Sequence, residues 1–68
     1  MIADELKKLR IQSGQSQAEL AEKLGDGGYT KQVVSAIENG KRNIGLSILH
    51  SWAKACGYHV NIQFVKND

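Results

Sequence analysis

Residues 16–42 read SQAELAEKLGDGGYTKQVVSAIENGKR and carry the strongest structural signals of the chain. Ser16 and Glu19 are spaced as a capping box, in which each side chain bonds the other's backbone N–H and so begins a helix. Apolar residues then recur at helical spacing. Gly25 is expected to end this helix, because glycine readily takes the left-handed conformation found at helix C-termini.

A second short helix is expected after a tight connection. Residues 26–28, Asp-Gly-Gly, have the composition of a turn, and Thr30 is suited to cap the segment that follows. Within residues 31–38 the apolar side chains form one stripe, and small or polar side chains cover the remaining surface. Two capped helices joined by a glycine-bearing turn predict a helix-turn-helix unit.

Two further helices and one strand are expected outside this unit. Residues 2–13 and 46–56 carry apolar side chains at helical spacing. The inward-facing side chains of the later helix are expected to be Leu46, Leu49, Ala53 and Cys56. Residues 58–65 instead alternate apolar and polar side chains, which is typical of a half-buried β-strand. The predicted fold is mainly α, with four helices in residues 1–57 and a dimerisation strand and tail in residues 58–68.

The predicted strand has no evident partner elsewhere in the sequence. Because a lone strand leaves backbone groups unpaired, we expect it to pair with the same strand of a second copy across a two-fold axis. The pairing would also cover a second apolar strip on residues 46–56, although a tryptophan that covers the edge of the core is an alternative interpretation. The expected dimer interface comprises Ile48, Trp52, Tyr58, Val60, Ile62 and Phe64.

Length and composition favour one small globular domain. The chain has 68 residues, of which 41% are hydrophobic and 24% charged, and its net charge of +2 is compatible with DNA binding. A single cysteine cannot form an internal disulfide, which favours a reducing cytoplasm. No segment approaches the roughly 18 apolar residues of a membrane span, and the N-terminus does not resemble a signal peptide. We therefore expect no membrane contact.

The sequence also lacks the constellations that enzymes and metal sites require. Cys56 and His59 have the spacing of half a metal site, but no second pair accompanies them. No nucleophile or carboxylate is placed beside His50 or His59, and no phosphate-binding glycine loop is present. We expect neither an enzyme, nor a metal site, nor a cofactor.

The blocks LKKLR, GQSQAELAEKLG and VVSAIENGKR occur in this order and are followed by ACG. This pattern resembles the lambda-repressor/Cro-type (XRE) DNA-binding family over about residues 6–57. The connection is longer than in the family, since eight residues separate Gly25 from Val34. Many members end in a fifth helix. The predicted strand instead resembles the antitoxin-type regulators of bacterial toxin–antitoxin pairs, which dimerise through such a strand.

The resemblance implies that residues 31–38 enter the major groove of double-stranded DNA with their N-terminal side chains at base edges. The implied base-reading residues are Lys31, Gln32, Ser35 and Ala36. A lysine can donate to guanine, a glutamine can bridge adenine, and an alanine methyl can meet a thymine methyl. A phosphate contact for Lys31 and an ordinary exposed position for Gln32 are the alternatives.

The resemblance also implies phosphate contacts and one structural ion pair. Helix starts and polar flanks are expected to hold phosphates, namely through Gln17, Tyr29, Thr30, Asn39, Lys41, Arg42 and Asn43. Tyr29 could instead swing away from DNA with its glycine-rich loop. In the family, an arginine in the place of Arg10 pairs with the glutamate that stands here as Glu38. Two independent surface charges are the alternative.

The sequence thus predicts a cytoplasmic, sequence-specific DNA-binding transcription regulator. We expect a homodimer that represses from a palindromic operator. The alternative is an antitoxin, in which the same dimer autoregulates its operon and uses another surface to neutralise a toxin protein. A third interpretation is an interaction module whose helix-turn-helix fold no longer touches DNA.

Overall fold

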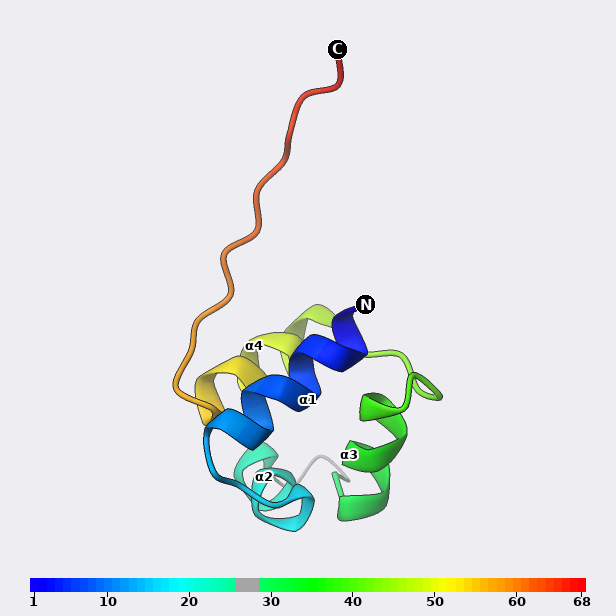
Figure 1. Cartoon of the computed structure of the whole chain (residues 1–68), viewed down its shortest axis with the longest axis vertical. Coiled ribbons are helices and arrows are strands. Elements are labelled where there is room, and N and C mark those ends of the chain that lie inside the picture. Colours follow the sequence, from blue (N-terminus) through cyan, green and yellow to red (C-terminus); the bar gives the residue numbers. More distant parts are fainter. Residues whose placement is uncertain (26–28) are drawn as a thin grey trace.

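The computed structural model describes residues 1–25 and 29–68 of the chain. Helices in that part of the chain are α1 (Ile2–Gln12), α2 (Gln17–Leu24), α3 (Lys31–Glu38) and α4 (Leu46–Ala55). They gather into one small body, from which residues 58–68 lead away (Figure 1). The turn expected at residues 26–28 lies outside the described residues. None of the described helices is both long and apolar enough to span a bilayer.

The helix boundaries follow the capping signals of the sequence. Ser16 Oγ accepts a hydrogen bond from the backbone N–H of Glu19 at 3.0 Å, and the Glu19 carboxylate accepts one from the backbone N–H of Ser16 at 2.8 Å. At the start of α3, Thr30 Oγ1 accepts from the N–H of Val33 at 3.3 Å. Gly25 ends α2 with a φ of +90°, which glycine tolerates. Its ψ of −166° is extended, so it is not the left-handed cap that we expected.

The core draws side chains from all four helices. Its largest fully buried side chains are Leu6, Leu20, Val34 and Trp52, one from each helix. The indole Nε1 of Trp52 donates to the backbone carbonyl of Leu6 at 3.1 Å, which satisfies the polar atom of the ring. The assignment of Trp52 to a dimer interface is therefore wrong, since its side chain is 0% exposed. A domain this small uses its largest side chain to fill the centre.

The first turn of α4 also departs from expectation. Leu46 was expected to face inward, but it is 64% exposed. Ala53 and Cys56 are buried, and Leu49 packs partly against the core. Leu46 and the buried Ala53 are seven residues apart and lie on nearly the same side of α4, so the exposure of Leu46 belongs to the first turn of the helix and not to a rotation of the whole helix. Ile48, a residue of the expected dimer interface, is partly buried.

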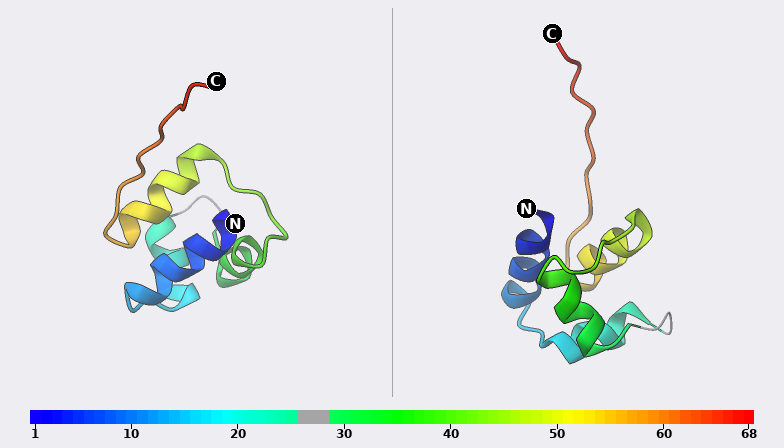
Figure 2. Two further views of the ribbon diagram at one scale, coloured as in Figure 1. Left: turned by 45° about the horizontal axis from the view of Figure 1, so that its top comes forward. Right: turned by 90° about the vertical axis from the view of Figure 1, so that its right-hand side faces the viewer.

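Residues 58–68 form an extended tail, and no strand is formed within the described residues. The Tyr58 hydroxyl donates to Gln12 Oε1 at 3.4 Å, and Val60 is partly buried, so the tail touches the body only where it begins. Farther along, Phe64 is 98% exposed. Figure 2 shows the tail leaving the helices in both views. The pairing of this segment with a second copy stays a prediction.

Candidate nucleic-acid interface

One groove of about 350 Å³ opens on the helix-turn-helix unit. It is formed by the start of α2, the outer face of α3 and the residues just after α3. The lining residues are Gln17, Lys31, Gln32, Ser35, Ala36, Asn39 and Lys41. This α2–α3 groove brings together all of the expected base-reading residues and three of the residues expected to hold phosphates.

Packing explains why α3 presents its polar side chains outward. Val34 and Ile37 belong to the core, and their burial fixes the rotation of the helix about its axis. Lys31 and Gln32 are exposed at the N-terminal end of α3. Two of the four side chains that the resemblance assigned to base edges therefore lie at the accessible end of the helix, whereas Ser35 and Ala36 are partly buried farther along it.

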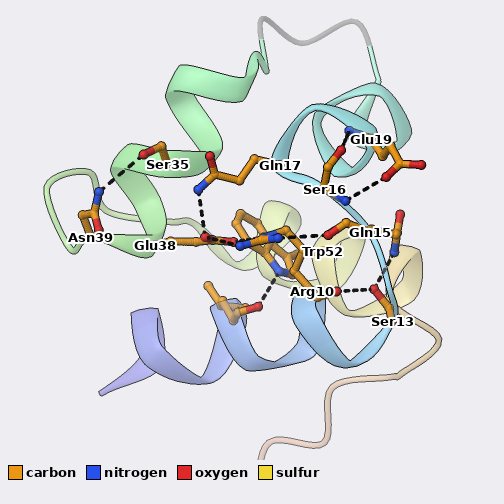
Figure 3. A network of polar contacts seen from close by, with 11 residues as sticks. Arg10, Ser13, Gln15, Ser16, Gln17, Glu19, Ser35, Glu38, Asn39 and Trp52 are labelled. Carbon is orange, nitrogen blue, oxygen red and sulfur yellow. Dashed lines mark hydrogen bonds and ion pairs between the residues drawn. The ribbon is translucent and has the colours of Figure 1, made fainter.

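The chain that follows α3 is held against the end of the helix. Asn39 Nδ2 donates to Ser35 Oγ at 3.4 Å (Figure 3). The carbonyl of Ala36 accepts from the backbone N–H of Lys41 at 2.9 Å and from that of Arg42 at 3.3 Å. Lys41 thereby lines the same groove as the residues expected to read bases.

The other residues expected to hold phosphates are not part of the groove lining. Arg42 and Asn43 are exposed and line a separate hollow near the start of α1. Thr30 is exposed, but its hydroxyl caps α3. Tyr29 is partly buried and packs against the core rather than swinging away with its loop.

Arg10 and Glu38 form an ion pair inside the protein. Arg10 Nε donates to Glu38 Oε2 at 2.6 Å, and Arg10 Nη2 donates to Glu38 Oε1 at 3.1 Å (Figure 3). Only 12% of the arginine side chain and 1% of the glutamate side chain are exposed. The hydrogen bond to Glu38 raises the pKa of Arg10 above its ordinary value. The two residues are thus not independent surface charges, and their pair joins α1 to the last turn of α3.

Gln17 makes a contact that sequence reasoning missed. Its side-chain Nε2 donates to Glu38 Oε1 at 3.1 Å, so its amide faces the protein as well as the groove (Figure 3). No spacing rule relates residues at the start of one helix and the end of the next, so the sequence held no local signal for this bond. The first N–H groups of a helix have no partner within the helix. At the start of α2, the capping box satisfies one of them, the N–H of Glu19.

The electrostatic character of the groove is positive. Glu38 is the acidic residue of α3, and its charge is matched by Arg10 within the protein. Lys31 and Lys41 line the groove and are exposed. A polyanion that approaches α3 therefore meets ammonium and amide groups, which are the donors that proteins use for phosphates and base edges.

Comparison with known proteins agrees with this geometry. A family model described as Helix-turn-helix (HTH_3) matches residues 6–62, which include most of α1 and all of α2, α3 and α4. Neither the curated proteins nor the solved structures gave a match. The chain belongs to the lambda-repressor/Cro-type (XRE) helix-turn-helix family of DNA-binding transcription regulators.

Proposed function

We propose that this chain is a sequence-specific repressor that binds a palindromic operator as a homodimer in the cytoplasm, and that it acts by binding rather than as an enzyme. The α2–α3 groove carries the proposal, because side chains to which we assign base reading and phosphate binding lie together on one accessible surface. An α-helix with its side chains is about 10–12 Å in diameter, which fits the roughly 12 Å width of the major groove. A repressor of this kind acts by occupying DNA that RNA polymerase would otherwise bind.

In the proposed complex the N-terminal end of α3 lies in the major groove. Lys31 donates to guanine O6 and N7, Gln32 bridges adenine N6 and N7, and the methyl group of Ala36 meets a thymine methyl. Ser35 lies beside them and can serve either kind of base. The exposure of Lys31 and Gln32 supports this docking.

Phosphate contacts would surround the reading helix on both sides. The backbone N–H groups at the start of α2, beginning with Gln17, meet one phosphate at the positive end of the helix dipole. After α3, the exposed residues Asn39, Lys41, Arg42 and Asn43 meet another strand segment. Thr30 and Tyr29 lie at the start of α3 and would add further phosphate contacts there. Such contacts orient the protein without reading sequence.

We assign dimerisation to the tail, residues 58–68, and DNA binding to residues 1–57. Tyr58 and Val60 lie nearest the body, whereas Ile62 is 51% and Phe64 is 98% exposed on the same alternating face. Pairing with the tail of a second copy would satisfy the backbone groups and cover these side chains. Two copies of α3 would then lie about 34 Å apart, one helical turn of DNA.

Selection from randomised duplexes with the purified protein tests the proposal, together with sedimentation at several protein concentrations. We expect one palindromic sequence to be enriched, with half-site centres about ten base pairs apart, and a dimer in solution. Equal affinity for every duplex at low salt would contradict sequence-specific binding. A monomer at all concentrations would contradict the dimer.

An antitoxin role is the second candidate. Ile11 is 57% and Leu46 is 64% exposed, and neither lines the α2–α3 groove, so apolar surface remains for a protein partner. The discriminating observation is a toxin-like reading frame that adjoins this gene. Inhibition of that purified toxin by this protein, and relief of inhibition in a Leu46→Asp variant, would support the role.

A further inference from the structure

We infer that the Gln17 side chain is a positioning residue, which sets the angle between α2 and α3 by holding Glu38. The Gln17 Nε2 to Glu38 Oε1 distance is 3.1 Å. Gln17 is the first residue of α2 and Glu38 is the last residue of α3, so one bond ties the two ends together. For its effect on DNA the inference rests on the proposed function, whereas its effect on helix geometry does not.

Three donors from two other helical regions converge on the Glu38 carboxylate. Arg10 supplies Nε and Nη2 from α1, and Gln17 supplies Nε2 from α2. Hydrogen bonds to an ionised acceptor are shorter and stronger than neutral ones. Because only 1% of the Glu38 side chain is exposed, water cannot readily replace a lost donor. The carboxylate therefore acts as a common anchor for α1, α2 and α3.

The position of this anchor explains why it matters for reading DNA. Glu38 lies at one end of α3, and the proposed reading residues Lys31 and Gln32 lie at the other, about 10 Å away along the helix axis. A tilt of about 5° at the anchor would displace the reading end by about 1 Å. Binding sites require placement within about 0.5 Å. The distance from the phosphate-binding end of α2 to the reading end of α3 therefore depends on this bond.

Other contacts between α2 and α3 remain when the bond is removed. Leu20 and Ala21 of α2 are buried in the same core as Val34 and Ile37 of α3. Loss of the Gln17 amide is thus expected to change the angle between helices rather than to unfold the unit. This separates a positioning role from a role in stability.

The test compares Gln17→Met, which keeps an unbranched side chain but removes the donor, with Gln12→Met on α1. The angle between α2 and α3 in the free protein is measured from residual dipolar couplings. Affinity is measured for the selected operator and for an unrelated duplex. We expect Gln17→Met to change the angle, to weaken operator binding about tenfold and to leave the unrelated duplex within about twofold, while Gln12→Met keeps the wild-type angle. Gln17→Ala provides a second variant if the methionine alters folding.

Other results would contradict either the positioning role of Gln17 or the proposed function. An unchanged angle would overturn the positioning role. Equal loss of affinity for both duplexes would also overturn it, because the side chain would then hold a phosphate directly. A changed angle in a protein that prefers no duplex would leave the positioning role standing and contradict the proposed function instead.

Discussion

Glu38 shows how much a single residue can organise in so small a protein. Its side chain is 1% exposed, and it accepts hydrogen bonds from Arg10 and Gln17. Taking a charge out of water is costly, and only a close partner with good geometry offsets that cost. Glu38, the glutamate of the IENG sequence at residues 37–40, therefore has a structural role, although it lies at the end of the helix whose outer face would read DNA.

Removal of the arginine tests this interpretation. We expect Arg10→Met to lower the free energy of unfolding by about 3–5 kcal/mol, because Glu38 is left buried and uncompensated. The double variant Arg10→Met with Glu38→Leu should recover most of that loss. Urea denaturation measures both. Lys8→Met is the control, since Lys8 lies 3.8 Å from Glu5 in an exposed pair, and it should cost less than about 1 kcal/mol. A similarly small effect for Arg10→Met would refute the buried pair.

A second prediction separates base reading from phosphate binding. Gln32→Ala should relax specificity at one base position by about 1–3 kcal/mol, because the proposed bidentate contact to adenine would be lost. Lys41→Ala should weaken binding to all duplexes similarly and reduce the salt slope by about 1. Selection on randomised DNA and titrations at several salt concentrations distinguish the two. An unchanged sequence preference after Gln32→Ala would remove this residue as a reader.

At the scale of the elements, the start of α2 depends on local chemistry alone. Ser16 and Glu19 bond each other's backbone N–H groups at 3.0 and 2.8 Å. We expect Ser16→Ala to cost about 1 kcal/mol of stability, because an N–H at the helix start loses its acceptor. Thermal or urea unfolding measures the loss. Ser47→Ala, in the first turn of α4, is the matched control and should be nearly neutral.

The same capping box predicts a dependence on pH. The backbone and side-chain hydrogen bonds from Ser16 lower the pKa of Glu19 below its ordinary value of about 4.5. A carboxyl group whose pKa is lower in the folded protein stabilises the fold above its unfolded pKa, and this contribution is lost as the pH falls through the lowered value. Unfolding measured from pH 7 to pH 3 should show a smaller acid-induced loss in Glu19→Gln than in the wild type. Identical pH profiles would contradict this coupling.

Local signals also explain which elements the sequence could predict. Capping residues and glycines act within a few positions, so the boundaries of α2 and α3 followed from Ser16, Gly25 and Thr30. The facing of α4 did not follow, because its sequence LSILHSWAKA is apolar on more than one side. Which side is buried depends on how Trp52 fits against the other helices. The hydrogen bond from Gln17 to Glu38 could not be predicted either, because the two residues lie on different helices.

At the scale of the whole molecule, the helical body and the tail differ in how they are held. The body buries a core from four helices, whereas Phe64 and Val65 of the tail are 98% and 84% exposed. The candidate groove was predictable because the family pattern fixes the outer face of α3. A dimer is not encoded in contacts within one chain, so the alternating pattern of the tail supports it only as a proposal.

A substitution in the tail tests the dimer without disturbing the body. Phe64→Asp should leave the free energy of unfolding of the helices unchanged, since this side chain packs little in the single chain. It should weaken dimerisation by about 3 kcal/mol or more, because each copy loses the burial of an aromatic side chain. Gln63→Asp adds the same charge on the opposite face of the tail and serves as the control. Sedimentation that shows equal dimer fractions for both variants and the wild type would argue against pairing through this face.

Methylation interference shows whether the outer face of α3 reads the major groove. A methyl group on guanine N7 lies in that groove, where Lys31 is proposed to donate. N7 methylation should block binding at guanines in two half-sites about ten base pairs apart, and Lys31→Ala should abolish this interference while leaving measurable affinity. Binding that is indifferent to N7 methylation throughout a selected, guanine-containing operator would contradict major-groove reading by α3.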